Sequence, residues 1–365
     1  MGRFDEELPV KQVRLAVATT RRAELETCAF CPRLCRAACP VSNAEPREAL
    51  TPFGKMTSLL ARAREDKSLL PYACTACGAC TTACRHENPV AEVLVEGRAA
   101  LADVGLGPSA AERVAREHPS RVLRLGARAA SLAEDAAVRS DATTALLLGC
   151  SVLSGPLESA ERLLRVASRV AGEPVRLLTE CCGVVPMLAG DPSGAERARE
   201  RLSRELRGVR RLVVADPGCL RGVLPDGEPL PHSPEPLSLF AWAASNTSRL
   251  TRVAAPGARY GLQMPCWARG TAAEPAALVL LERLVGGFVT VAAGCSGGGG
   301  LLPVTYPEVS AAIARRRLDE LAFEGVSHVV TACAASARRF RTAAPEGAPE
   351  VVDLGTLLWE GLGKP

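Results

Sequence analysis

The most informative stretch of the 365 residues lies at positions 74–84 and runs Cys74-Thr-Ala-Cys77-Gly-Ala-Cys80-Thr-Thr-Ala-Cys84. A second run precedes it, Cys28-Ala-Phe-Cys31-Pro-Arg-Leu-Cys35-Arg-Ala-Ala-Cys39-Pro40. The chain has fifteen cysteines, an odd number, and its first residues lack the apolar core of an export signal. Thiols clustered in this way in a reducing compartment are expected to be metal ligands or redox groups rather than disulfides.

Composition restricts the class of protein. Hydrophobic residues make up 47% of the chain and charged residues 23%, which is ample for packed cores and rules out a disordered chain. The formal net charge is only +4, so we expect no nucleic-acid partner. No apolar run reaches the roughly 18 residues of a membrane span. We therefore expect two or three compact units, no transmembrane segment and a cytoplasmic location.

The cysteine spacing of the run at 74–84, C-x2-C-x2-C-x3-C, is the signature of bacterial ferredoxins. In that arrangement three cysteines of a run bind one 4Fe–4S cluster and the fourth binds the other. The expected ligands are Cys28, Cys31, Cys35 and Cys84 for cluster one, and Cys74, Cys77, Cys80 and Cys39 for cluster two. Zinc sites also use C-x2-C pairs, but they take two separated pairs rather than four cysteines in one short run.

Amphipathic patterns over residues 10–26, 48–66 and 90–104 predict helices around the two runs. A compact ferredoxin made of β-hairpins would not need them. The N-terminal part therefore resembles the all-helical ferredoxin module of the iron–sulfur subunits of succinate dehydrogenases and heterodisulfide reductases. We expect this two-cluster domain to occupy residues 1–104, followed at 105–143 by a helical connector that is a plain spacer.

The C-terminal part contains a tandem repeat. Buried strands are predicted before Cys150 and before Cys266, and the intervals from Cys181 to Cys219 and from Cys295 to Cys333 are both 38 residues. Strands alternate with helices in each half, which predicts parallel sheets. Loops at the carboxyl ends of such strands converge, so each half should gather its thiols at one edge. We place repeat one at 144–257 and repeat two at 258–365, an α+β multidomain chain with two tandem α/β repeats.

This order of cysteines, with Cys181-Cys182-Gly183 in the middle of repeat one, resembles the cysteine-rich CCG domain. That domain occurs twice in the heterodisulfide reductase B subunit. It also occurs in the iron–sulfur subunits of anaerobic glycerol-3-phosphate dehydrogenase, glycolate oxidase and lactate-utilisation systems. The family motif has five cysteines per repeat and can hold a non-cubane cluster. Here Gly222 stands at the fifth position of repeat one, and Ser296 and Ser336 stand at two cysteine positions of repeat two.

The remaining thiols of each repeat are compatible with more than one metal state. Repeat one keeps Cys150, Cys181, Cys182 and Cys219, which could hold a third iron–sulfur cluster or a zinc ion. Repeat two keeps Cys266, Cys295 and Cys333, which could hold a cluster with one open iron, or no metal. Buried cysteines without a metal are the alternative in both repeats. The four histidines show no pairing at catalytic spacing, and the glycine-rich loop at 294–300 could approach a cluster or be merely flexible.

The resemblance implies an electron-transfer subunit of an oxidoreductase, itself not catalytic. It would relay single electrons between an FAD-dependent dehydrogenase partner and a quinone or thiol/disulfide acceptor. A quinone-linked acceptor would place the protein at the membrane periphery, held there through a partner. A catalytic disulfide-reductase-like subunit with a cluster in the CCG crevice is the first alternative. A redox sensor based on a cluster or zinc is the second.

Overall fold

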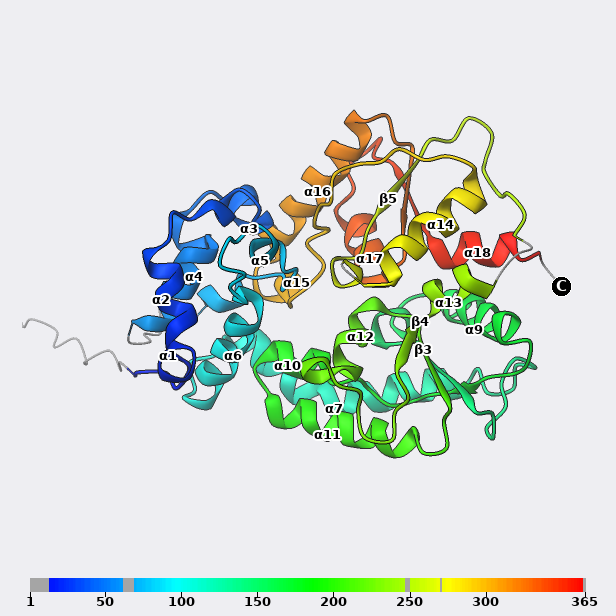
Figure 1. Cartoon of the computed structure of the whole chain (residues 1–365), viewed down its shortest axis with the longest axis horizontal. Helices are drawn as coiled ribbons and strands as arrows, with labels where there is room; N and C mark the ends of the chain where they lie inside the picture. Colours follow the sequence, from blue (N-terminus) through cyan, green and yellow to red (C-terminus); the bar gives the residue numbers. More distant parts are fainter. Residues whose placement is uncertain (1–12, 62–68, 247–249, 270, 364–365) are drawn as a thin grey trace, which may run out of the picture.

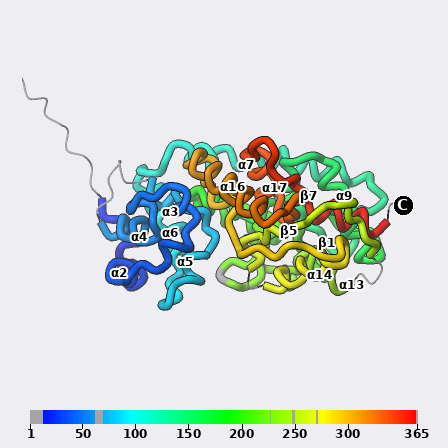
Figure 2. The backbone as a smooth tube through the Cα atoms, turned by 90° about the horizontal axis from the view of Figure 1, so that it is seen from above, coloured from blue at the N-terminus to red at the C-terminus, as the bar shows by residue number. Residues whose placement is uncertain are grey.

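The computed structural model describes residues 13–61, 69–246, 250–269 and 271–363. An N-terminal helical part lies at one end of the molecule, and two α/β parts lie side by side at the other end (Figure 1). The view at right angles shows the same division, with the helices of residues 22–103, α2 to α6, grouped apart from the sheets (Figure 2).

The N-terminal part is helical; the helix predicted over 90–104 is present as α6, and the other two predicted helices are interrupted. Its elements are α1 Val17–Thr20, α2 Arg22–Phe30, η1 Leu34–Arg36, α3 Pro40–Ala44, η2 Glu48–Leu50, α4 Pro52–Leu60, η4 Leu70–Tyr72, α5 Ala79–Thr82 and α6 Val90–Asp103.

Two predicted helices are interrupted. The helix expected over residues 10–26 is broken at Arg21, whose backbone is not helical and which separates α1 from α2. The Arg21 side chain donates a hydrogen bond to Glu96 of α6. Residues 10–12 lie outside the described part. The helix expected over 48–66 divides into η2 and α4, because Thr51 precedes a proline and adopts an extended conformation. Residues 62–66 lie outside the described part as well. Thr51 then caps α4 by accepting a hydrogen bond from Gly54 N at 3.0 Å.

The connector contains one long helix, α7 Ser109–Ala130, which carries Pro119 in its interior. This helix packs against α10 Val184–Ala189, a helix of repeat one.

Repeat one is a four-stranded parallel sheet in the order β2-β1-β3-β4 with helices around it. Its elements are β1 Thr144–Leu147, α8 Cys150–Leu153, α9 Leu157–Ala171, β2 Arg176–Leu177, α10 Val184–Ala189, α11 Pro192–Glu205, β3 Arg211–Val214, α12 Pro217–Val223, η5 Pro225–Gly227, β4 Pro236–Ser238 and α13 Leu239–Asn246.

Repeat two has the same order of elements around the parallel sheet β5-β6-β7. Its elements are β5 Tyr260–Gln263, η6 Cys266–Ala268, α14 Ala273–Val285, α15 Leu302–Thr305, α16 Pro307–Phe323, β6 His328–Thr331, α17 Ala334–Ala343, β7 Glu350–Asp353 and α18 Leu354–Gly361. The strand that corresponds to β2 is reduced to a single bridge between Gly261 and Val289. The predicted duplication and the parallel sheets are thus present.

The two repeats share one core. The largest apolar cluster combines buried side chains of repeat one, such as Leu146 and Leu164, with side chains of repeat two, such as Leu280 and Leu358. Burial of this kind stabilises by about 25 cal/mol per Å² of apolar surface, so the repeats are expected to fold against each other.

One fully buried arginine joins all three parts. Arg98 of α6 is 0% exposed and donates hydrogen bonds to four carbonyl oxygens. These belong to Pro71 and Cys74 of the N-terminal part, to Leu188 of repeat one and to Gly300 of repeat two, at 2.8–3.0 Å. Because a buried guanidinium without partners is costly, these contacts fix how the parts sit together. Within the described residues, no helix is both long and apolar enough to cross a bilayer.

Candidate metal centres

The four cysteines expected at cluster one lie together. Cys28 lies in the last turn of α2, Cys31 and Cys35 follow in the loop and η1, and Cys84 follows α5. The pKa of Cys28 is raised to about 12, chiefly by burial and then by the charges of Cys31, Cys35 and Cys84. Asn88 Nδ2 donates to Cys28 Sγ at 3.1 Å, a hydrogen bond that stabilises the thiolate. The side chains therefore converge as a set of sulfur donors.

The four cysteines expected at cluster two also lie together. Burial raises the pKa of Cys80 first, and the charges of Cys74, Cys77 and Cys39 raise it further. Lys55, only 1% exposed, places its Nζ 3.7 Å from Cys39 Sγ. A buried ammonium is unusual, and here it offsets the negative charge that thiolates would carry.

A repeated turn points backbone N–H groups at the sulfurs. The residue two positions after a cysteine has a positive φ, and its N–H donates to that cysteine at 3.3–3.4 Å. The four pairs are Arg33 with Cys31, Ala76 with Cys74, Gly183 with Cys181, and Gly297 with Cys295. Arg33 and Ala76 are not glycines, so their strained backbone is held by the surrounding structure. Such N–H groups favour thiolates and cluster sulfides.

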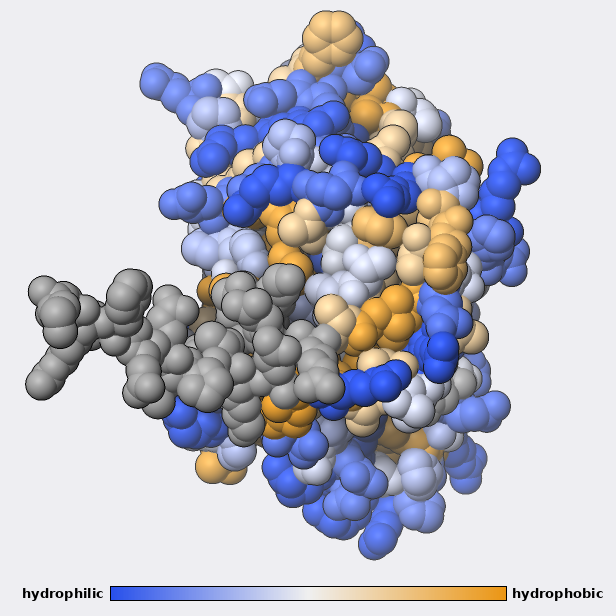
Figure 3. All heavy atoms as spheres, turned by 90° about the vertical axis from the view of Figure 1, so that its left-hand side faces the viewer, coloured by the Kyte–Doolittle hydropathy of each residue, from blue (hydrophilic) through white to orange (hydrophobic). Residues whose placement is uncertain are grey.

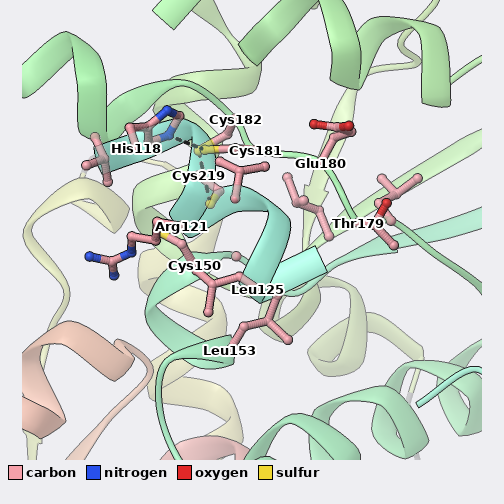
Figure 4. Close-up of a pocket in the computed structure, with 15 residues that line it drawn as sticks. His118, Arg121, Leu125, Cys150, Leu153, Thr179, Glu180, Cys181, Cys182 and Cys219 are labelled. Atoms are coloured by element: carbon pink, nitrogen blue, oxygen red, sulfur yellow. Dashed lines mark hydrogen bonds between the residues drawn. The ribbon is translucent and has the colours of Figure 1, made fainter. Parts of the chain in front are cut away.

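Repeat one gathers its four cysteines at the carboxyl ends of its strands, as the fold predicts (Figure 4). Cys182 Sγ lies 3.2 Å from Cys219 Sγ. Burial raises the pKa of Cys150 to about 12, with the charges of Cys181 and Asp216 acting in the same direction. A metal would have to displace the protons of these thiols.

His118 of α7 enters this pocket from outside the repeat. Its Nε2 lies 3.4 Å from Cys181 Sγ, and the residue is 4% exposed. The sequence predicts a plain spacer at residues 105–143 and shows no pairing for the histidines, so it does not predict this contact. Spacing along the chain could not find it, because 63 residues separate His118 from Cys181.

The positions where the family has further cysteines are closed. A Cβ at Gly222 would lie 2.5 Å from Cys182 O and 2.9 Å from its Sγ, so no side chain fits there. Ser296 Oγ and Ser336 Oγ hydrogen-bond to each other at 2.8 Å inside the protein. One hydroxyl donates and the other accepts, and Ser296 Oγ also accepts from Gly298 N at 3.4 Å.

The thiols of repeat two meet cluster two. Cys295 Sγ donates to Thr75 Oγ1 of the second cysteine run at 3.8 Å, and Cys295 lines the same cavity as Cys77. Hydrogen bonding between the two thiols lowers the pKa of Cys77 and raises the pKa of Cys295. Burial raises the pKa of Cys266 to about 12, followed by the charges of Cys77 and Cys333. Cys295, Cys266 and Cys77 therefore form one group across the boundary between repeat two and the N-terminal part.

Two protein families match the chain. Residues 24–88 match the 4Fe-4S dicluster domain, and residues 144–223 and 260–335 match the cysteine-rich domain CCG, in two copies. The chain is a CCG-domain iron–sulfur protein. No curated protein matches it closely enough to name a relative.

The donor set of this CCG-domain protein suits iron–sulfur clusters. Eight thiols converge in two groups of four, with backbone N–H groups directed at Cys31 and Cys74. Among the described residues, no group of three or more His, Cys, Asp or Glu side chains is arranged to hold a single metal ion. In repeat one the thiols instead hydrogen-bond to each other, as Cys182 and Cys219 do, and a metal would replace those contacts.

The glycine-rich loop at 294–300, whose role the sequence did not decide, packs against the second cysteine run. A Cβ at Gly300 would lie 2.1 Å from Cys74 O, and one at Gly299 would lie 2.6 Å from Thr75 O. The glycines let repeat two approach the backbone of the second cysteine run directly. Lys55, Asn88 and His118 were not identified from the sequence. Only Lys55 left a signal there, as one of four lysines in an arginine-rich chain.

Proposed function

We propose that this CCG-domain protein is an electron-transfer subunit that relays single electrons from a flavoprotein partner to a downstream acceptor. The observation that carries the proposal is the position of Cys295 of repeat two, which donates to Thr75 Oγ1 at 3.8 Å and lines the same cavity as Cys77, an expected ligand of cluster two. It supports a continuous path of thiols from the N-terminal clusters into the repeats. The clusters, when bound, would supply the one-electron redox chemistry.

Exposed apolar residues mark where a partner could approach cluster one. Phe30, which precedes Cys31, is 88% exposed, and Leu34, which precedes Cys35, is 61% exposed. The face on this side mixes hydrophobic and hydrophilic residues (Figure 3). Interfaces for transient electron transfer are small and mixed in this way. We propose an FAD-dependent dehydrogenase as this partner, and cluster one as the group that it reduces.

The ligand sets stay as expected from the sequence: Cys28, Cys31, Cys35 and Cys84 for cluster one, and Cys39, Cys74, Cys77 and Cys80 for cluster two. For repeat one we propose a metal, iron–sulfur or zinc, held by Cys150, Cys181, Cys182 and Cys219. For Cys266, Cys295 and Cys333 the proposal keeps the two states expected from the sequence, a cluster with one open iron or no metal. The acceptor would be a quinone or a thiol/disulfide compound, and the cytoplasmic location with peripheral membrane association stays a prediction.

The proposed domain limits follow the same division. The dicluster domain would span 1–104 and the connector 105–143, since α6 ends at Asp103 and β1 begins at Thr144. Repeat one would span 144–257 and repeat two 258–365.

The test is anaerobic purification of the full chain with its natural partner, followed by analysis of iron, sulfide, zinc and flavin and by EPR of the reduced form. Two cubanes predict about eight irons per chain, and a third cluster raises this to about twelve. Flavin should appear in the partner alone. Cys295→Ala should leave reduction of the N-terminal clusters by the partner intact but slow their reoxidation by added quinone or disulfide.

Two results would contradict the proposal. One is a preparation without a flavoprotein in which the chain alone reduces a disulfide, which would favour the catalytic alternative. The other is unchanged reoxidation in Cys295→Ala, which would remove repeat two from the electron path. The closed position at Gly222 and the Ser296–Ser336 pair argue against a five-thiolate catalytic cluster.

A further inference from the structure

The pocket of repeat one has four thiols from its own motif and no room for a fifth. Because the backbone and thiol of Cys182 fill the space beside Gly222, any additional ligand must come from another part of the chain. Four residues of the connector helix α7 line this pocket, His118, Arg121, Val122 and Leu125, and His118 is the one with a metal-binding side chain.

The polar neighbours of His118 in this pocket are engaged elsewhere. Arg121 Nη2 donates to Ser154 Oγ at 3.1 Å. Glu180 pairs with Arg201 at 3.2 Å, and Thr179 Oγ1 donates to Glu205 at 2.9 Å. Within the described part of the chain, the hydrogen-bond contact of the His118 ring is with Cys181.

The position of the imidazole suits a metal ligand. It is buried, it points from α7 toward the sulfur of Cys181, and Cys182 and Cys219 lie beside it (Figure 4). Neutral imidazole is a common metal ligand and combines with thiolates in zinc sites and in some iron–sulfur centres. When His replaces Cys at an iron–sulfur centre, the reduction potential rises, because a neutral ligand replaces a negative one.

We propose that His118 is a nitrogen ligand of the metal centre in repeat one, bound through Nε2 as one of four protein ligands, the other three being thiolates from Cys181 and two of Cys150, Cys182 and Cys219. The thiols release their protons to solvent on binding, and the present contact between His118 and Cys181 is replaced by two bonds to the metal. The inference rests on the metal proposed for repeat one. It does not depend on the two N-terminal clusters or on the electron path.

The experiment uses the full chain, labelled with ¹⁵N-histidine and purified anaerobically. The chain has only four histidines, so the label is sparse. If the centre is paramagnetic, pulsed EPR should show the strong nitrogen coupling of a directly bound imidazole, with the change in frequency that ¹⁵N produces. If the metal is zinc, X-ray absorption should show a mixed nitrogen and sulfur shell.

Two variants identify the histidine. His118→Ala should abolish the nitrogen coupling or the nitrogen shell, while the signals of the N-terminal clusters persist. His232→Asn is the control, because His232 is exposed and its positive φ is compatible with asparagine. This variant should retain the nitrogen signal. The measurement on the labelled wild-type protein stands even if His118→Ala does not fold.

A metal in repeat one without direct nitrogen coupling or a nitrogen shell would overturn the proposal, since His118 would then be only a hydrogen-bond partner of Cys181. Absence of any metal from repeat one would overturn it too. In the second case the iron content and EPR of the N-terminal clusters would still report separately on the proposed function.

Discussion

At the scale of single residues, two buried cations, Lys55 and Arg98, lie beside the cysteines of cluster two. Burial raises the pKa of Cys74, and the positive charges of Lys55 and then Arg98 oppose that rise. Among the described residues, cluster one has instead the neutral amide of Asn88 on Cys28. Because positive charge stabilises the reduced, more negative form of a cluster, cluster two should have the higher potential.

We predict that Lys55→Met lowers the midpoint potential of cluster two by about 60 mV, which is the one-electron equivalent of losing roughly 1.4 kcal/mol of charge stabilisation. A redox titration followed by EPR measures it. The potential of cluster one is the internal control, and Lys55→Arg should restore most of the difference. Equal shifts of both clusters, or no shift, would show that the charge of Lys55 does not act on cluster two.

At the scale of elements, a glycine loop permits the contact between repeat two and the second cysteine run. Gly300 has φ +64, and a Cβ there would lie 2.1 Å from Cys74 O. We predict that Gly300→Ala separates the loop from the run, lowers the iron retained at cluster two and lowers the thermal unfolding midpoint. Iron analysis, EPR and calorimetry measure these effects.

The matched control for this loop is Gly347→Ala. Gly347 has φ +76, and a Cβ there would meet no atom within 4 Å, so its substitution adds only backbone strain, about 1–2 kcal/mol. If the two variants lose the same stability and Gly300→Ala keeps all its iron, the close approach of the loop is not required for cluster two.

At the scale of the whole molecule, the three parts depend unequally on their metal. Cluster assembly and folding are coupled in small metal-binding modules, and the N-terminal helices are short. We therefore predict that Cys77→Ala destroys the N-terminal module, whereas Cys333→Ala leaves a soluble protein with both N-terminal clusters. The shared apolar core of the repeats explains why loss of Cys333 is tolerated.

Iron content, EPR and circular dichroism of the two variants test this difference. A Cys77→Ala protein with all its iron would show that Cys77 is not a ligand. A Cys333→Ala protein that is insoluble or lacks N-terminal clusters would show that repeat two is needed for their assembly.

The sequence by itself was sufficient for features that depend on local spacing. Short intervals between cysteines constrain the thiols of each run to one loop, so the dicluster domain follows from residues 28–84 alone. Equal spacing of Cys181–Cys219 and Cys295–Cys333 established the duplication, and alternating strands and helices established the parallel sheets. Helix ends were less accurate, because Arg21 and Thr51 interrupt continuous apolar patterns.

Only the tertiary structure decided which distant residues share a site. His118 meets Cys181, Arg98 meets Leu188 and Gly300, and Cys77 meets Cys295, each across a long interval of chain. Contacts of this kind depend on how helices and loops pack, and packing is set by shape and burial over the whole molecule rather than by any local pattern.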